Sequence, residues 1–332
     1  MRWVGRTLAA AVTALLALAP TSGAAVQDEK ATSDGYPARP IRIVVPFPPG
    51  AGTDIIARML AQVLGEAWRQ TVIVDNRTGA GGTIGSDIVA KASPDGYTLL
   101  LGNVSTLALA PSLYPKLPYV PLRDFAPITL ITTSHNVLVT HPSVPANSVK
   151  ELIALAKARP GQLTYGSSGS GTTSHLGGAL FAHMAGVQLV HVPYKGSAPA
   201  HVDLLAGQLQ LSFSTIVTTL PFIKSGRLKG LAVTSLNRSP LLPHLPTVAE
   251  TLPGFEVLVW QGIVAPAAAP RATIARLNQE IARSLHGPHM REHLAKQGLE
   301  AVGNTPEEFA AFIQSETGKW GKVIRLTGAK AE

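Results

Sequence analysis

Two segments rich in glycine and hydroxyl groups contain the residues best suited to holding a small anion. The first, residues 49–54, follows a short apolar run, and the second, residues 165–175, contains four serines, two threonines and three glycines. Each segment precedes a helical pattern, where free backbone N–H groups and the helix dipole attract negative charge. Because neither segment contains Lys or Arg, backbone N–H and hydroxyl groups would supply the hydrogen bonds.

Three shorter polar stretches also fall at the ends of predicted strands. They are residues 102–106, 193–197 and 213–215, and each could place a polar side chain beside the two segments. The alternative for each stretch is a helix cap or a turn that binds nothing. For the two longer segments, the alternatives are a tight turn and a polar surface linker.

The motifs of common enzymes are incomplete in this chain. A dinucleotide fingerprint begins at Gly50 but has Ile55 where its third glycine belongs, and no P-loop lysine follows a glycine run. The serine-rich segment has Ser170 where a nucleophile elbow needs its last glycine. His289 and His293 fit an H-x-x-E-H zinc pattern, which we interpret as a solvated, charged helix face. We therefore predict no catalytic residues, no cofactor and no metal ion.

Alternating strand and helix patterns place these segments at the ends of strands. Residues 41–45, 72–74 and 97–101 are predicted strands, and residues 55–67 and 84–92 are predicted helices, the first capped by Thr53 or Asp54. This order favours a largely parallel α/β sheet covered by helices.

A second group of elements follows after two apolar runs, residues 128–131 and 137–139, that no helix separates. We interpret these runs as a crossing into a second lobe and residues 228–234 as the return. The second lobe begins with a helix capped by Ser148 and Glu151, and the chain ends with one capped by Thr305 and Glu308. Two crossings imply a hinge and a cleft between the lobes, where a small ligand is readily enclosed.

The N-terminus has the features of a secretory signal. Arg2 and Arg6 precede the apolar stretch Thr7–Ala19, and small residues follow up to Ala25. We therefore predict a signal peptide over residues 1–25 and a mature protein in the periplasm; the alternative is a retained anchor. The chain has no Cys, which excludes disulfides and a lipid-modified cysteine. Its formal charge of +8 is scattered and little interleaved with aromatic residues, which argues against a nucleic-acid surface.

Seven motifs occur along the chain in a characteristic order. They are PIRIVVPF (40–47), GTD (52–54), VDNR (74–77), GAGG (79–82), PDGYTLL (94–100), HVPYKG (191–196) and LPT (245–247). Together they resemble the substrate-binding receptors of tripartite tricarboxylate transporters, the Bug or TctC family. The resemblance extends from Tyr36 to the C-terminus.

The resemblance implies a periplasmic binding protein (Venus-flytrap) fold, with two α/β lobes, a hinge and an interlobe cleft. It implies a carboxylate held between residues 47–54 and 167–172 by main-chain and hydroxyl groups, with ordered waters adding contacts. Ala51 departs from the family, which usually has a further glycine there; its methyl group would matter only if its φ were positive. The predicted ligand residues are Phe47, Ala51, Gly52, Thr53, Asp54, Asn103, Ser105, Ser167, Ser168, Gly169, Ser170, Thr172, His175, Tyr194 and Ser214.

We thus expect a monomeric solute-binding receptor that captures a small carboxylate-containing organic acid for the membrane permease subunits of such a transporter. Lobe 1 is predicted to comprise residues 36–135 and 236–332, and lobe 2 residues 136–235. Two alternatives are a sensor module that presents its ligand to a membrane kinase and a hydrolase that uses the same cleft. The hydrolase would have to rely on His175, His191 and Asp54, which form no evident triad.

Overall fold

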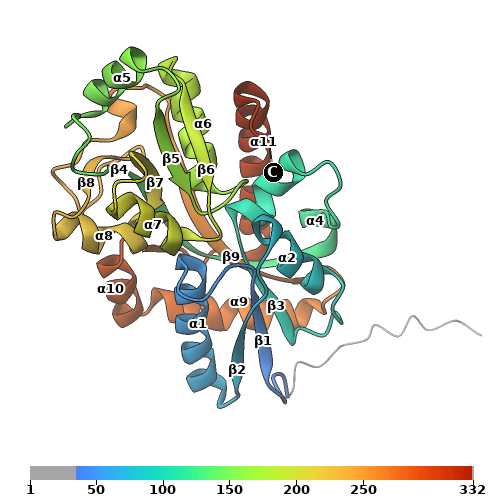
Figure 1. The fold of residues 1–332 in the computed structure, drawn as a ribbon. Helices are drawn as coiled ribbons and strands as arrows, with labels where there is room; N and C mark the ends of the chain where they lie inside the picture. Colours follow the sequence, from blue (N-terminus) through green and yellow to red (C-terminus); the bar gives the residue numbers. More distant parts are fainter. Residues whose placement is uncertain (1–34, 331–332) are drawn as a thin grey trace, which may run out of the picture. The chain divides into compact units, whose positions relative to one another are not determined.

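The computed structural model describes residues 35–330, whose course is shown in Figure 1. The strands of this part are β1 (Ile41–Val45), β2 (Val72–Asn76), β3 (Thr98–Asn103), β4 (Phe125–Thr140), β5 (Leu163–Ser167), β6 (Leu189–Pro193), β7 (Leu211–Thr215), β8 (Lys229–Val233), β9 (Leu258–Pro266) and β10 (Glu300–Ala301). They form one sheet in the order β2-β1-β3-β9-β4-β7-β5-β6, while β8 and β10 each pair with β4.

The α-helices of residues 35–330 are α1 (Gly52–Trp68), α2 (Thr83–Ala90), α3 (Ala110–Leu113), α4 (Pro121–Asp124), α5 (Val149–Ala158), α6 (Thr173–Ala185), α7 (Ser197–Leu205), α8 (Ile216–Lys224), α9 (Arg271–His286), α10 (Pro288–Lys296) and α11 (Pro306–Thr327). Two short 3-10 helices, η1 (Ala80–Gly82) and η3 (Val248–Glu250), and a π-helix, η2 (Ser105–Leu109), complete them. Within the described residues, no helix combines the length and apolar character that a membrane crossing requires. The predicted signal peptide lies outside them.

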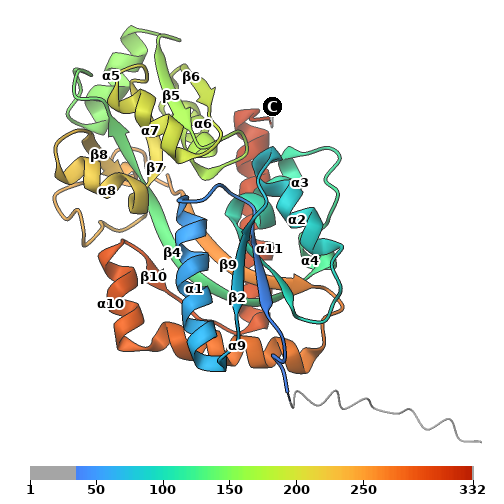
Figure 2. The same cartoon turned by 60° about the horizontal axis from the view of Figure 1, so that its bottom comes forward.

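Parallel pairing dominates both ends of the sheet, as the alternation of strands and helices predicts. Strand β1 pairs in parallel with β2 and β3, and β5 pairs in parallel with β6 and β7. Helices α1 and α2 contact the first group, and α6 and α7 contact the second, as Figure 2 shows. The predicted α/β class is therefore confirmed.

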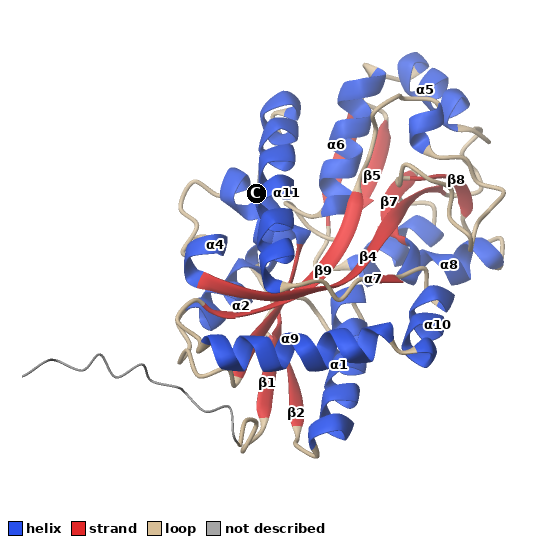
Figure 3. Ribbon diagram, turned by 180° about the vertical axis from the view of Figure 1, so that it is seen from behind, coloured by secondary structure: helices blue, strands red, loops and turns tan. Residues whose placement is uncertain are grey.

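The chain passes from one part of the sheet to the other within strand β4. Its first part pairs with β9 up to the partners His135 and Leu258, and from Asn136 onward it pairs with β7 and β8. Figure 3 shows β4 and β9 side by side between the two parts of the sheet. The two apolar runs of the sequence are thus one 16-residue strand.

The stretch that the sequence suggests as the return crossing packs with the second part of β4. Residues 228–234 contain β8, which pairs with the second part of β4. Leu242 and Leu245 then pack in the same cluster as Val137 and Val139 of β4. We therefore propose that residues 236–257 belong to the second lobe and that the chain returns to the first lobe with β9. The two-lobe division itself stays a prediction.

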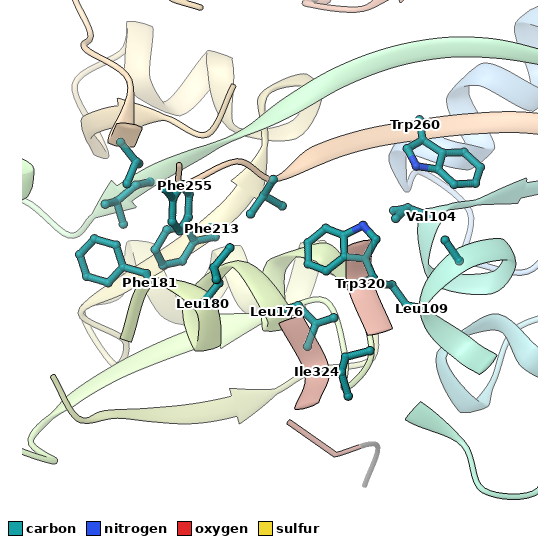
Figure 4. Packing of buried hydrophobic residues seen from close by; sticks show 14 of the residues in the cluster. Val104, Leu109, Leu176, Leu180, Phe181, Phe213, Phe255, Trp260, Trp320 and Ile324 are labelled. Atoms are coloured by element: carbon teal, nitrogen blue, oxygen red, sulfur yellow. The ribbon is translucent and has the colours of Figure 1, made fainter. Parts of the chain in front are cut away.

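One cluster of buried apolar side chains joins helices α6 and α11 to strands β4, β7 and β9. In Figure 4, Phe181, Phe213 and Phe255 gather at one end of it, and Trp260 and Trp320 lie toward the other. The rings of Phe181 and Phe213 are 5.5 Å apart, within the range of favourable aromatic contacts. Burial of each such side chain contributes about 1.5–3 kcal/mol to folding.

The N-caps of two helices follow the sequence pattern. Ser148 accepts a hydrogen bond from the Glu151 N–H at 3.2 Å, although the Glu151 carboxylate reaches the N–H of Asn147 instead of that of Ser148. Thr305 and Glu308 form the complete reciprocal capping box.

The predicted cap of α1 is wrong. The helix begins at Gly52, its N-cap is Ala51, and Ala51 makes no capping hydrogen bond through its side chain. Its φ of −69° also means that its methyl group causes no backbone strain.

A buried carboxylate joins α11 to β9. Glu316 is 5% exposed, and its Oε2 accepts hydrogen bonds from the indole N–H groups of Trp260 at 3.0 Å and Trp320 at 3.1 Å. Loss of this carboxylate would leave two buried donors without an acceptor.

We expect Glu316→Leu to lower the free energy of unfolding by about 2–5 kcal/mol, because each unpaired buried donor costs roughly 1–3 kcal/mol. Glu316→Gln retains an acceptor oxygen and should cost less. Chemical denaturation measures both changes, with exposed Gln314→Leu on the same helix as the control. Equal stabilities of the Glu316→Leu and Gln314→Leu proteins would refute this role for Glu316.

Candidate functional site

The two predicted anion-binding segments lie against neighbouring parts of the other half of the sheet. A Cβ atom built on Gly196 would lie 3.4 Å from Pro48 Cγ, and one built on Gly81 would lie 3.3 Å from the Ser170 carbonyl oxygen. Pro48 precedes α1, and Ser170 precedes α6. Each segment therefore lies against a loop from the other half of the sheet: the segment after β1 against the loop before α7, and the segment after β5 against η1.

The Asp54 side chain fixes the conformation of residues 47–52, at the start of the first segment. Its carboxylate is 2% exposed and accepts hydrogen bonds from the Gly50 N–H at 2.8 Å and from Asn76 Nδ2 at 2.9 Å. The same Asn76 group donates to the Phe47 carbonyl at 2.9 Å. Arg58 adds an ion pair at 3.0 Å. The Asp54 side chain therefore braces the segment from within.

The electrostatics of Asp54 agree with this role. Burial opposes ionisation of its carboxyl group, but hydrogen bonds, above all from Arg58, outweigh burial and hold its pKa below the ordinary value. The carboxylate is thus charged at neutral pH and compensated locally by Arg58. Its lone pairs are occupied by the protein, so the predicted direct ligand role of Asp54 has no support in this geometry.

The start of α1 supplies uncommitted donors. The first N–H groups of a helix have no acceptor within it, which applies here to Gly52 and Thr53. The Thr53 side chain is 5% exposed, and within the described residues its hydroxyl group makes no hydrogen bond to the protein. These groups follow Ala51 directly and can donate to an anion.

Most hydroxyl groups of the second segment, residues 165–175, form hydrogen bonds with other groups of the same segment. Ser167 Oγ accepts from the Gly169 N–H at 3.2 Å, and Thr172 Oγ1 donates to the Gly169 carbonyl at 2.7 Å. Ser168 Oγ lies 3.1 Å from Ser174 Oγ. Ser167, Ser168, Gly169 and Thr172 therefore form the scaffold of the loop.

Ser170 is different from the other serines of this segment. Its Oγ is shielded from solvent and has no hydrogen-bond partner among the described residues. Buried hydroxyl groups are normally paired, and an unpaired one needs an explanation. Its position beside Gly81, at the meeting of the two halves of the sheet, makes it a donor available to a bound molecule.

His175 lies behind this segment. Its Nδ1 accepts a hydrogen bond from the Gly171 N–H at 3.2 Å, and its ring stacks on that of His191 with centroids 4.0 Å apart. Burial lowers the pKa of His175 to about 4, so the ring is neutral at physiological pH. The side chain supports the loop through Gly171.

Three further predicted residues, Asn103, Tyr194 and Ser214, also form hydrogen bonds to the protein. Asn103 Oδ1 accepts from the Ser105 N–H at 3.0 Å and so fixes the start of the π-helix η2. π-Helices are rare in proteins, and those that occur often lie at functional sites. Tyr194 donates its hydroxyl to Asp203 at 2.6 Å, and Ser214 Oγ lies 2.8 Å from Ser212 Oγ. Direct ligand contacts by the Tyr194 and Ser214 hydroxyls therefore have no support in this geometry.

Three features of the site were not selected from the sequence. Ser174 joins Ser168 to Thr172, Asn76 connects Asp54 to Phe47, and Tyr114 places its hydroxyl 3.1 Å from the Ala80 carbonyl. Asn76 lies in the VDNR motif, but its type alone does not reveal its partners. Ser174 is a common residue type for a first helical turn, so nothing distinguished it.

The structure offers no metal centre among the described residues. No group of three or more His, Asp or Glu side chains within residues 35–330 is arranged to hold an ion. The side chain of His289 lies outside the described part, so the interpretation of the H-x-x-E-H pattern stays a prediction.

A cavity of about 700 Å³ lies elsewhere, where β4 passes between the two parts of the sheet. Its walls include Ser134, His135, Ser239 and Arg291, and none of the predicted ligand residues lines it. We base the candidate site on the two segments instead, because each leads into a helix N-terminus and contains a hydroxyl group without a hydrogen-bond partner among the described residues.

We expect Asp54→Ala to lower the free energy of unfolding by about 2–4 kcal/mol, because it leaves the Gly50 N–H and the Asn76 amide without their acceptor. The matched change Arg58→Met removes the exposed partner of the ion pair but leaves the Gly50 N–H and the Asn76 amide paired with Asp54, so it should cost less than Asp54→Ala. Urea denaturation of both variants distinguishes these values. A larger loss for Arg58→Met would contradict the proposed brace.

Comparisons with known proteins identify the family of this chain. The model of the tripartite tricarboxylate transporter family receptor matches residues 56–329. The chain is 44% identical over 293 residues to a UPF0065 protein in the tcbD-tcbE intergenic region of Pseudomonas sp. (strain P51), covering 88% of this chain and 87% of that protein.

Two solved structures are similar over most of the chain. The R. palustris protein Rpa4515 with adipate has a TM-score of 0.87 and 36% identity, covering 90% of this chain and 100% of that chain. MatC from Rhodopseudomonas palustris with bound malate has a TM-score of 0.82 and 31% identity, covering 87% and 100%. The chain therefore has the fold of periplasmic binding proteins and belongs to the tripartite tricarboxylate transporter receptor family, as its motifs predicted.

Proposed function

We propose that this protein is a periplasmic receptor that binds a small organic acid through a carboxylate and delivers it to the permease subunits of a tripartite transporter. The observation that carries the proposal is the set of unpaired donors in the two segments. They are the first N–H groups of α1, the Thr53 hydroxyl and the buried Ser170 hydroxyl. A carboxylate offers about four acceptor positions and can satisfy several of these donors together.

Neutral donors suit a receptor that must also release its ligand. Hydrogen bonds from N–H and O–H groups to a charged group each contribute about 1.5–3 kcal/mol, and no buried ion pair has to be broken on release. The buried charge of the first segment, that of Asp54, is compensated by Arg58. The site therefore attracts an anion without a cationic side chain in either segment.

The likeness to proteins with adipate and malate supports dicarboxylates as the ligand class. Both are flexible aliphatic acids whose two carboxylates can reach two groups of donors. The two segments here supply such groups from opposite parts of the sheet.

Hydrolysis is a poor alternative, although Ser167 and His191 resemble a nucleophile and its base. Ser167 Oγ lies 2.6 Å from His191 Nε2. Ser167 Oγ, however, accepts the Gly169 N–H and so fixes the conformation of its own loop. Within the described residues, no ion pair with a carboxylate orients His191, as a triad would require.

We expect Thr53→Val and Ser170→Ala each to weaken dicarboxylate binding by about 1–2 kcal/mol, in line with the loss of one hydrogen bond to a charged group. A thermal-shift screen of mono-, di- and tricarboxylates, amino acids and aromatic acids first identifies a ligand by the rise in melting temperature. Titration calorimetry with that ligand then measures both variants.

The stability of the ligand-free variant shows whether Ser170 contacts the ligand or supports the fold. Ser170→Ala removes an unpaired buried hydroxyl and should leave the ligand-free protein at least as stable as the original. Ser225→Ala, at an exposed position, is the control for both measurements. Unchanged affinity in both the Thr53 and the Ser170 variant would refute the proposed site, and a screen without any carboxylate hit would refute the function.

A further inference from the structure

Two stacked histidines lie directly behind the Ser167–Thr172 segment. The rings of His175, on α6, and His191, on β6, have centroids 4.0 Å apart and planes inclined by 15°. The ring of Tyr165, on β5, lies 5.0 Å from that of His191, and its hydroxyl donates to the His175 carbonyl at 3.2 Å. Side chains from one helix and two paired strands thus fix the two rings.

Each ring accepts a hydrogen bond from the loop through a different nitrogen. His175 Nδ1 accepts the Gly171 N–H at 3.2 Å. Ser167 Oγ already accepts the Gly169 N–H, and its other partner among the described residues is His191 Nε2 at 2.6 Å. The proton of the buried Ser167 hydroxyl has an acceptor only if the hydroxyl donates it to His191 Nε2. His175 is therefore the Nε2–H tautomer and His191 the Nδ1–H tautomer.

The surroundings keep both rings neutral. The titratable groups near the pair are Tyr165 and, farther along α6, His183. No carboxylate forms an ion pair with either ring within the described residues. Burial and, to a smaller extent, the neighbouring His175 lower the pKa of His191 to about 3.

The two contacts determine which way the loop presents its groups. Gly169 and Gly171 flank Ser170 and have φ values of +134° and +78°, which only glycine adopts readily. Their N–H groups are bound by Ser167 and His175, so both point inward. Ser170, between them, is left as the residue whose hydroxyl is unpaired.

We propose that His175 and His191 are positioning residues of the ligand site, which hold Ser170 toward the ligand by accepting the Gly171 N–H and the Ser167 O–H. This inference rests on the proposed carboxylate-binding function. Neither histidine contacts the ligand. Each acts through an acceptor atom at one defined position of its ring.

Amide side chains test the positions of these acceptors. Asn places its amide oxygen where His has Nδ1, and Gln places it where His has Nε2. His175→Asn and His191→Gln should therefore bind adipate within about threefold of the original protein at pH 7, because each retains its hydrogen bond. The exchanged amides, His175→Gln and His191→Asn, and the apolar His175→Leu and His191→Leu should each lose about tenfold or more.

Calorimetry with adipate, or with malate if adipate does not bind, measures these affinities. His183→Asn is the matched control, because His183 lies on the same helix but is exposed. A purely steric role would not separate Asn from Gln at each position. Equal affinities of the two amide variants at both positions would overturn the proposal.

Nitrogen NMR of the histidine rings tests the arrangement without any ligand. At pH 7, we expect unprotonated Nδ1 in His175 and unprotonated Nε2 in His191, with slow exchange of the Gly171 amide proton. A proton on either of these nitrogens would overturn the proposal. If neither acid binds the original protein, the carboxylate found in the thermal-shift screen replaces them. If that screen finds none, the proposed function fails, and the ring tautomers still decide whether the histidines organise the loop.

Discussion

Strand β4 passes through both halves of the sheet, and the arrangement of the candidate site depends on this continuity. Residues up to His135 pair with β9, and residues from Asn136 onward pair with β7 and β8. The strands that end in the two ligand segments, β1 and β5, are held on opposite sides of this passage. A change of twist within β4 would therefore alter the distance between the segments, since no helix intervenes to absorb it.

The polar residues of the site have two separate tasks. Asp54, Ser167, Thr172 and His175 satisfy backbone groups of their own loops. This leaves few donors unpaired, among them those of Thr53 and Ser170. Preorganisation of this kind is favourable for binding, because the loops do not have to be ordered when the ligand arrives. It also explains why the site contains many more hydroxyl groups than one carboxylate can contact.

The sequence predicts the positions of the loops well and the directions of their side chains poorly. Apolar periodicity and glycine runs located the segments before α1 and α6, because these patterns reflect local structure. The inward role of Asp54 depends on Asn76, which is 22 residues away, and that of Tyr194 depends on Asp203. Such pairs arise from tertiary packing, so the residue type alone suggested a ligand contact for both.

The later return of the chain that we propose also rests on tertiary contacts. Residues 228–234 look like a return crossing because they form an apolar run after a helix. Their pairing with β4 and the packing of Leu242 in one cluster with Val137 and Val139 became visible only in three dimensions.

The carboxylate shared by Trp260 and Trp320 has an optical consequence. Both indole groups are buried, and both depend on one oxygen atom of Glu316 for their hydrogen bonds. Trp260 belongs to β9, which pairs with β3 and with the first part of β4, and Trp320 belongs to α11. Any shift of the helix against that strand would change the polarity around two chromophores together. The intrinsic fluorescence of the protein is thus a label-free reporter of movement at this junction.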